Sequence, residues 1–169
     1  MKKLATFISA VLAGAAISIG GAVFLCTESR TAGAALFSVG LFAVCTLGLD
    51  LFTGKVCYIF QNPPAYTVRC GLIWLGNLTG TLLMGTLLRL TRLDVIEKAQ
   101  GICEGKLSDG LLSVFLLAVF CNILIYLSVE SYRENPHELG KYLGLFLGVV
   151  VFVQAGFEHL SLIHISEPT

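Results

Sequence analysis

The sequence predicts an all-helical integral membrane protein with about five membrane-spanning helices, and two observations carry this prediction. Hydrophobic residues make up 56% of the chain and charged residues only 13%, about half of the ~25% that a soluble domain carries. The charges are also clustered, which leaves five long stretches without Asp, Glu, Lys or Arg. These stretches approach the ~20 apolar residues that a helix needs to cross the hydrocarbon core of a bilayer.

The spans are expected in order along the chain. Residues 4–26 form the first span, which is interpreted as uncleaved because it is longer than the ~7–15 apolar residues of a signal peptide. Residues 32–60 form the second, and Pro63 and Pro64 follow it because proline stops a helix. The other expected elements are a third span at 70–88, a polar connection at 89–110, a fourth span at 111–129, a loop at 130–141 and a fifth span from about Tyr142.

The second and fifth spans share an interruption. Each is apolar for most of a helix and then carries a glycine and an acid, in Gly48-Leu49-Asp50 and Gly156-Phe157-Glu158. A charge at the bilayer centre costs at least ~2.5–3.5 kcal/mol, so such groups face protein or water. Glycine beside polar residues favours a broken helix, and a matching pair indicates a transport site between inverted repeats. Alternatively, both acids lie at helix ends near the lipid headgroups.

Other functional classes find little support in the sequence. The formal net charge is zero and there is no basic run, so nothing indicates nucleic-acid binding. The six cysteines form no C-x-x-C pair and have no metal-ligand spacing with the three histidines. We therefore expect no metal, no cofactor and no enzymatic activity. The Lys2-Lys3 pair favours a cytoplasmic N-terminus.

Four short motifs follow one another over roughly residues 5–159. They are Asp50-Leu51-Phe52-Thr53-Gly54, which is similar to [ED]-L-F-T-[GS]; Trp74-Leu75-Gly76-Asn77-Leu78-Thr79-Gly80, which is similar to Y-x-G-N-x-x-G; Cys121-Asn122; and Gly156-Phe157-Glu158-His159, which matches G-F-E-H. In their order and spacing these motifs resemble those of the formate–nitrite transporter family. In addition, Lys106 precedes Asn122 by sixteen residues, as the family's lysine does. The resemblance implies an aquaporin-like six-helix inverted-repeat fold with helices two and five broken, assembled as a homopentamer in a bacterial inner membrane.

The resemblance also implies roles along an anion pathway. His159 would be the pore-centre histidine that meets the anion, and Thr53 would face it from the break in helix two. Lys106 would supply positive potential at the outer vestibule, and Asn122 would line the pore near His159. The apolar constrictions would be Leu51, Phe52 and Ile125 on the outer side, and Phe37, Leu41 and Phe152 on the inner side.

Other residues of the motifs are expected to be structural. Asp50 and Gly54 would stabilise the break in helix two, and Gly156 and Glu158 the break in helix five. Lys55 departs from the family, which usually has an uncharged polar residue there, and this change would alter the field beside Thr53.

The expected function is a channel or transporter for small monovalent anions, such as formate, nitrite or related weak-acid anions. Desolvating a bare anion is expensive, so transport linked to protons through His159 would let the anion pass as a neutral species. The alternatives are a non-transporting membrane scaffold or a truncated, inactive remnant. A water channel of the aquaporin type is disfavoured because there is no Asn-Pro-Ala motif. We expect an incomplete transporter-like domain at 1–159 and a non-native tail at 160–169, which has no membrane pattern.

Overall fold

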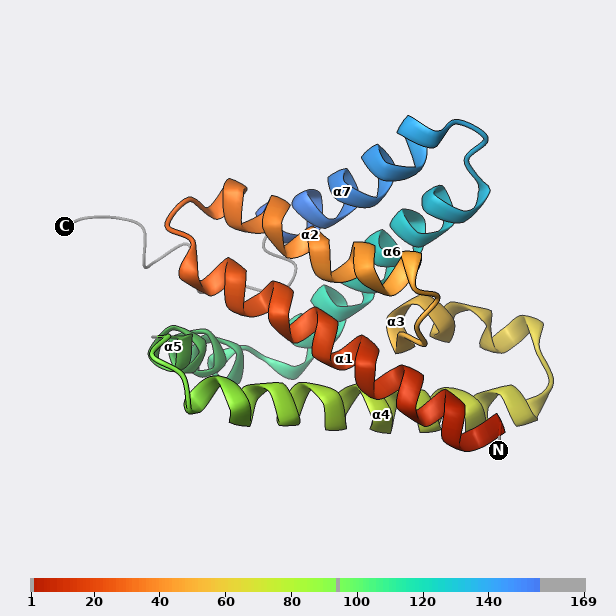
Figure 1. The fold of residues 1–169 in the computed structure, drawn as a ribbon, viewed down its shortest axis with the longest axis horizontal. Helices are drawn as coiled ribbons and strands as arrows, with labels where there is room; N and C mark the ends of the chain where they lie inside the picture. The colour runs from red at the N-terminus through yellow and green to blue at the C-terminus, as the bar shows by residue number, and fades with distance from the viewer. Residues whose placement is uncertain (1, 94, 156–169) are drawn as a thin grey trace.

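The computed structural model describes residues 2–93 and 95–155, and this part of the chain is helical, with no strand (Figure 1). Of the described helices, α1, α4 and α6 are long and apolar enough to cross a membrane by length and composition. The predicted all-helical fold class is therefore confirmed. In chain order the elements are α1 (Lys2–Cys26), α2 (Arg30–Thr46), α3 (Phe52–Lys55), the 3-10 helix η1 (Val56–Gln61), α4 (Pro64–Arg89), α5 (Val95–Ser108), α6 (Leu111–Glu134) and α7 (Glu138–Gln154).

Helices α1 and α4 lie side by side and run in the same direction (Figure 1). Glycine makes their close approach possible. A Cβ atom added to Gly76 would lie 2.6 Å from the Cβ of Ala10, and one added to Gly80 would collide with the carbonyl of Val11. Small residues thus bring the two backbones into contact, as is common between membrane helices.

Helix α2 packs antiparallel on α1 in the same way. A Cβ atom on Gly20 would lie 2.8 Å from the carbonyl oxygen of Phe37, and one on Gly40 would lie 2.8 Å from that of Ala16. The first half of α2 therefore lies beside the second half of α1.

The second span is broken after α2, as the sequence predicted. Gly48 has a φ of +63°, a left-handed backbone value that glycine adopts without the steric penalty of a Cβ atom. The chain then runs without helical structure to Leu51, where α3 and η1 continue the span. Proline is well tolerated in the first turn of a helix, and α4 begins at Pro64 rather than near residue 70.

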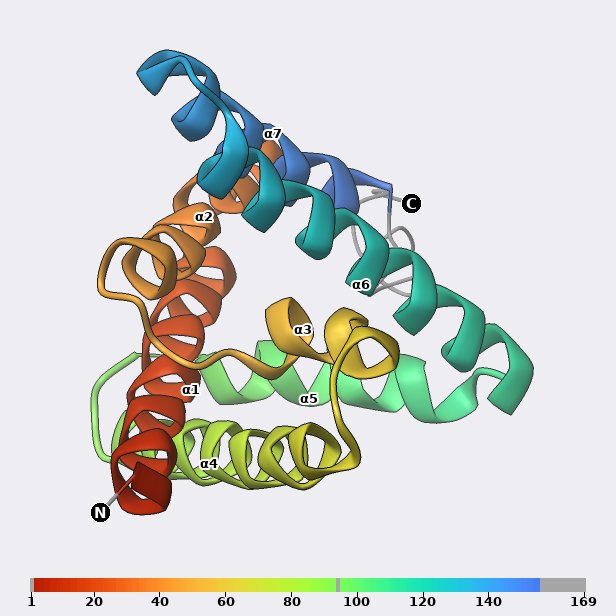
Figure 2. The same cartoon turned by 90° about the vertical axis from the view of Figure 1, so that its right-hand side faces the viewer.

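Helices α6 and α7 repeat the arrangement of α1 and α2 in the opposite direction (Figure 2). Helices α2 and α7 both have 17 residues, and they contact each other antiparallel. One guanidinium nitrogen of Arg30 donates to the carbonyl of Val153 at 2.7 Å, while the rings of Phe42 and Tyr142 lie 5.9 Å apart. This is the predicted inverted repeat. The predicted break at Gly156 lies outside the described residues.

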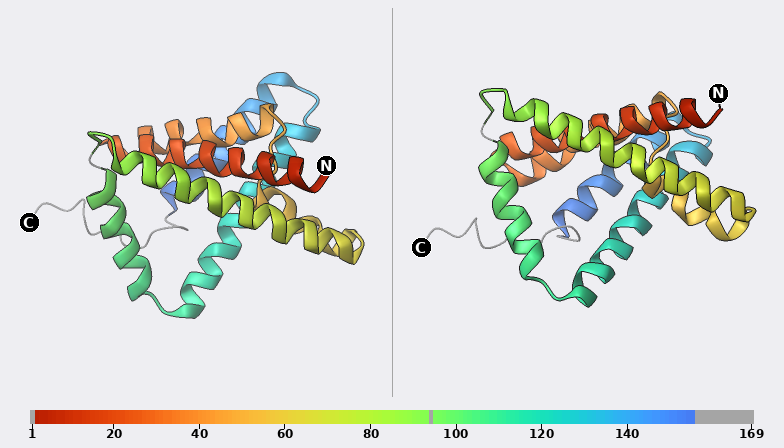
Figure 3. Two further views of the ribbon diagram at one scale, coloured as in Figure 1. Left: turned by 60° about the horizontal axis from the view of Figure 1, so that its bottom comes forward. Right: turned by 90° about the horizontal axis from the view of Figure 1, so that it is seen from below.

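The polar connection expected at 89–110 contains a helix, α5, which the sequence analysis missed. The Nζ atom of Lys98 donates to the carbonyl of Leu25 at 2.9 Å, which places the start of α5 at the C-terminal end of α1. Helices α5 and α6 then form a V in projection (Figure 3). Helix α6 also continues to Glu134, so the loop expected at 130–141 is only Asn135 to His137.

Candidate functional site

The break in the second span is held by side chains of α1 and α4, and Asn77 makes most of the bonds. The Phe52 N–H donates to Oδ1 of Asn77 at 2.8 Å. The Nδ2 atom of Asn77 donates to the carbonyls of Asp50, at 3.0 Å, and Ala10, at 2.8 Å. The Asp50 N–H donates to Oγ of Ser9 at 2.9 Å. Backbone groups freed by the break are thus paired within the protein, as a non-helical segment at membrane depth requires.

The carboxylate of Asp50 is shared by two cations. Asp50 is only 8% exposed, and its Oδ1 lies 3.2 Å from Nζ of Lys55 and 3.4 Å from a guanidinium nitrogen of Arg69. A buried charge is tolerated when it is paired, and these contacts tie α3 to α4. Lys55 therefore does not stand as an isolated charge beside Thr53.

Two predicted pathway residues carry a buried polar atom with no hydrogen-bond partner. These atoms are Oγ1 of Thr53 in α3 and Oδ1 of Asn122 in α6. The other end of the Asn122 amide donates to the carbonyl of Ala118 at 2.8 Å. Buried polar side chains are nearly always hydrogen-bonded, so two such atoms on helices that contact each other indicate places where water or a ligand supplies the missing partner.

The predicted constriction residues fall into two groups. Phe37 and Phe152 meet edge to face, with 6.1 Å between their ring centroids. Leu41, which is 2% exposed, belongs to the same buried cluster as Phe152. Leu51 and Ile125 pack against this cluster from the direction of the break.

The two groups lie at different levels along α1. Phe37 lies beside Gly20, in the second half of α1. Phe52, which neighbours Leu51, shares Asn77 with Ala10 in the first half of α1. Because α2 runs antiparallel to α1, a cytoplasmic N-terminus would put Phe52 nearer the inner side and Phe37 nearer the outer side. The predicted order of the constrictions and the predicted cytoplasmic N-terminus therefore exclude each other, and the side that each constriction faces stays a prediction.

Other predicted residues cannot be placed in this geometry. His159, Gly156 and Glu158 lie outside the described residues, and Lys106 lies in α5 with its side chain outside the described part. Within the described residues, no group of three or more His, Cys, Asp or Glu side chains could hold a metal ion.

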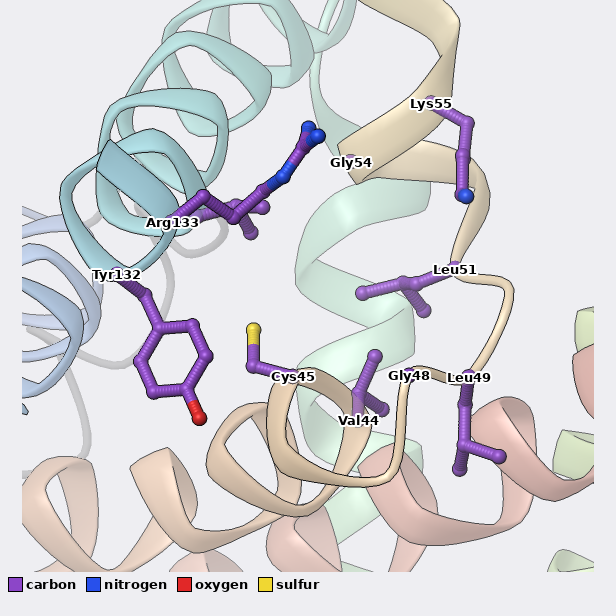
Figure 4. Close-up of a pocket in the computed structure, with 10 residues that line it drawn as sticks. Val44, Cys45, Gly48, Leu49, Leu51, Gly54, Lys55, Tyr132 and Arg133 are labelled. Atoms are coloured by element: carbon purple, nitrogen blue, oxygen red, sulfur yellow. The ribbon is translucent and has the colours of Figure 1, made fainter.

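A cavity of about 260 Å³ lies beside the break, between the end of α2, α3 and the last turns of α6 (Figure 4). Leu51 and Gly54, two of the predicted site residues, line it. Cys45, Lys55 and Arg133 also contribute to its wall, and the sulfur of Cys45 points into it. The break beside this cavity lies near the start of α1, because the Asp50 N–H donates to Ser9 there.

Asn77, Ser9 and Arg133 had no role in the sequence prediction. Asn77 entered it only as one position of the motif from Trp74 to Gly80, although an amide in the middle of an apolar span itself indicates a buried polar contact. Arg133 gave no signal, because its region was expected to be a loop and only the structure places it at the end of α6 beside the break.

Inverted helical repeats, with one helix interrupted and unpaired polar atoms beside the interruption, are typical of membrane channels and transporters. The chain belongs to the formate/nitrite transporter family, whose model matches residues 1–162. This is a family of transporters and not of enzymes, as the sequence predicted.

Individual relatives agree with this membership. The chain is 30% identical over 144 residues to the uncharacterized transporter YrhG of Bacillus subtilis, and this match covers 78% of the chain and 54% of YrhG. It is 29% identical over 139 residues to the formate channel BtFdhC of Bacillus thuringiensis, covering 76% and 54%. A solved pentameric formate channel with formate bound matches with a TM-score of 0.80 and 26% identity, over 94% of this chain and 71% of that one. The chain thus spans about half the length of YrhG and of BtFdhC.

Proposed function

We propose that this protein carries small monovalent anions, of the formate or nitrite type, across a bacterial inner membrane. Its N-terminus faces the cytoplasm, and it assembles as a homopentamer with one pathway in each protomer. The relatives that are named as formate channels, together with the broken second helix, support this function.

The observation that carries the proposal is the pair of unpaired polar atoms on Thr53 and Asn122. A scaffold helix has no reason to bury a hydroxyl and an amide oxygen without partners, since each such group costs roughly 1–3 kcal/mol. In a transport pathway, passing water or a protonated acid supplies the hydrogen bond.

The apolar groups on either side give the pathway its selectivity. The ring pair Phe37–Phe152 on one side, and Leu51 with Ile125 on the other, offer nothing to solvate a bare charge. A histidine changes its charge near neutral pH. We propose that His159 donates a proton or a hydrogen bond to the passing anion, so that flux rises as the outer pH falls.

The test is formate flux into proteoliposomes under an acid gradient, read with an internal pH dye. The intact chain is expected to give uptake that increases with the gradient. Thr53→Val should lower this uptake without lowering thermal stability, because the lost hydroxyl has no protein partner, and His159→Asn should abolish the pH dependence. Unaltered pH-dependent flux in His159→Asn would refute the proton link, and no flux from well-folded protein would favour the scaffold or remnant.

The pentamer is tested separately. Helices α4 and α6 expose large apolar side chains, such as Leu82 at 62% and Phe115 at 64%, which need lipid or a neighbouring subunit. Mass measurement in detergent by light scattering is expected to give five chains per particle, and a monomer would contradict this assembly.

A further inference from the structure

The cavity beside the break carries positive charge and no compensating acid on its wall. Among the described residues that line it there are two cations, Lys55 and Arg133, and no carboxylate. Its volume of about 260 Å³ is far above the roughly 10–15 Å³ of such volume that one water needs. Several waters, or a small anion with part of its hydration shell, fit inside.

Lys55 can turn toward an anion without leaving an unpaired charge behind. Its Nζ atom lies 3.2 Å from Asp50, which also holds Arg69 at 3.4 Å. If Lys55 leaves, Arg69 still neutralises the carboxylate. The lysine side chain is 37% exposed and has a flexible four-carbon stem, so this exchange of partners requires no movement of the backbone.

Arg133 is held in place by Glu130 of its own helix and by Tyr58 of η1. Its NH1 atom donates to Glu130 at 3.2 Å and to the Tyr58 hydroxyl at 3.1 Å, and Tyr58 in turn donates to Glu130. A guanidinium has five N–H donors, and these two bonds use only one nitrogen. In Figure 4 the Arg133 side chain reaches from α6 toward Gly54.

We propose that this cavity is an anion-binding vestibule on the side of the α1 N-terminus, where Lys55 and Arg133 hold a small monocarboxylate or nitrite before it reaches the constriction at Leu51. The identity of the ligand rests on the proposed function. The vestibule depends on the charges of Lys55 and Arg133, the cations among the described residues of its wall.

Cys45 provides a probe of the cavity that does not depend on transport, because its sulfur points into the cavity (Figure 4). The intact protein in liposomes is treated with methanethiosulfonates that carry either a sulfonate or a trimethylammonium group. Mass spectrometry then reads the labelling rate at Cys45, with Cys57, which does not line the cavity, as an internal reference. The measured quantity is the ratio of the sulfonate rate to the trimethylammonium rate.

Lys55→Gln and Arg133→Gln should each lower this ratio about four- to tenfold, since removing one nearby charge changes the two rates in opposite directions. A matched cation serves as the control. Lys141→Gln removes a lysine of α7 that pairs with Glu138 at 2.8 Å. Lys141 does not line the cavity, so this variant should keep the wild-type ratio. Formate at millimolar concentration should slow labelling of the wild type by a small neutral methanethiosulfonate, and slow it less in Lys55→Gln.

Three results would overturn the vestibule: an unchanged ratio in both cavity variants, a Cys45 that reacts with no reagent, or an equal fall in Lys141→Gln and Lys55→Gln. The last result would mean that the effect does not depend on where the charge lies. If the ratio shifts as expected but the liposomes take up no formate, the anion site stands and the proposed transport function fails.

Discussion

Replacing Asn77 by alanine tests whether one amide holds the break of the second span. The substitution removes three hydrogen bonds, to the Phe52 N–H and to the carbonyls of Asp50 and Ala10, at 2.8, 3.0 and 2.8 Å. The Phe52 N–H has no helical partner, and an unpaired buried donor costs roughly 1–3 kcal/mol. The two carbonyls lose about 0.5–1 kcal/mol each. We therefore expect Asn77→Ala to lose about 2–5 kcal/mol of folding free energy.

For a chain of this length, that loss lowers the midpoint of thermal unfolding by roughly 4–20 °C. The assay is thermal unfolding in detergent, followed by the binding of a thiol-reactive dye to the buried Cys70 and Cys121. Asn62→Ala is the matched control, because the Asn62 amide donates only to the carbonyl of Tyr58 in its own turn, and it is exposed. Equal midpoints for the two variants would refute the reasoning that Asn77 holds the break.

Three further substitutions separate packing, backbone strain and pathway chemistry. Gly80→Ala should prevent correct folding, because the new Cβ atom collides with the backbone of Val11, whereas Gly85→Ala on the same helix meets nothing within 4 Å and should elute as wild type by size exclusion. Gly48→Ala should lower the unfolding midpoint by the equivalent of about 1–2 kcal/mol, since φ is +63° and a Cβ atom disfavours this conformation; an unchanged midpoint would contradict this. Thr53→Val should keep the wild-type midpoint and lose formate flux, and a variant that loses stability but keeps flux would show that the hydroxyl is structural.

The break of the second helix could be predicted from the sequence because several local signals coincide there. Gly48 can adopt a left-handed backbone, Asp50 is too costly to leave in lipid, and both follow a helix-length apolar run. Each signal depends on the residue itself and not on its distant neighbours. The same argument explains why the spans of α1 and α6 start at the predicted residues or close to them.

Contacts between distant segments could not be predicted in this way. No local pattern says that Asn77 bonds to both Ala10 and Phe52, because that requires the parallel packing of α1 and α4. Helix α5 was missed because the prediction looked for apolar spans, and this helix carries charged residues such as Glu97 and Lys98. The order of the constrictions across the membrane depends on helix direction, which no local pattern gives.

The charges around Asp50 lead to a last prediction, which concerns Lys55 and Arg69 together. Both cations contact one oxygen of a carboxylate that is 8% exposed. Either of them alone can neutralise it, so Lys55→Ser or Arg69→Gln should each cost only about 0.5 kcal/mol, as for exposed ion pairs. The double variant leaves a buried charge unpaired and should cost about 3 kcal/mol. A double-mutant cycle is therefore expected to give a coupling of about 2 kcal/mol, measured by thermal unfolding at constant pH and salt. Additive losses would contradict this shared pairing. They would also mean that Lys55 leaves Asp50 unpaired when it binds an anion in the cavity, so that each binding event would carry the cost of a buried charge.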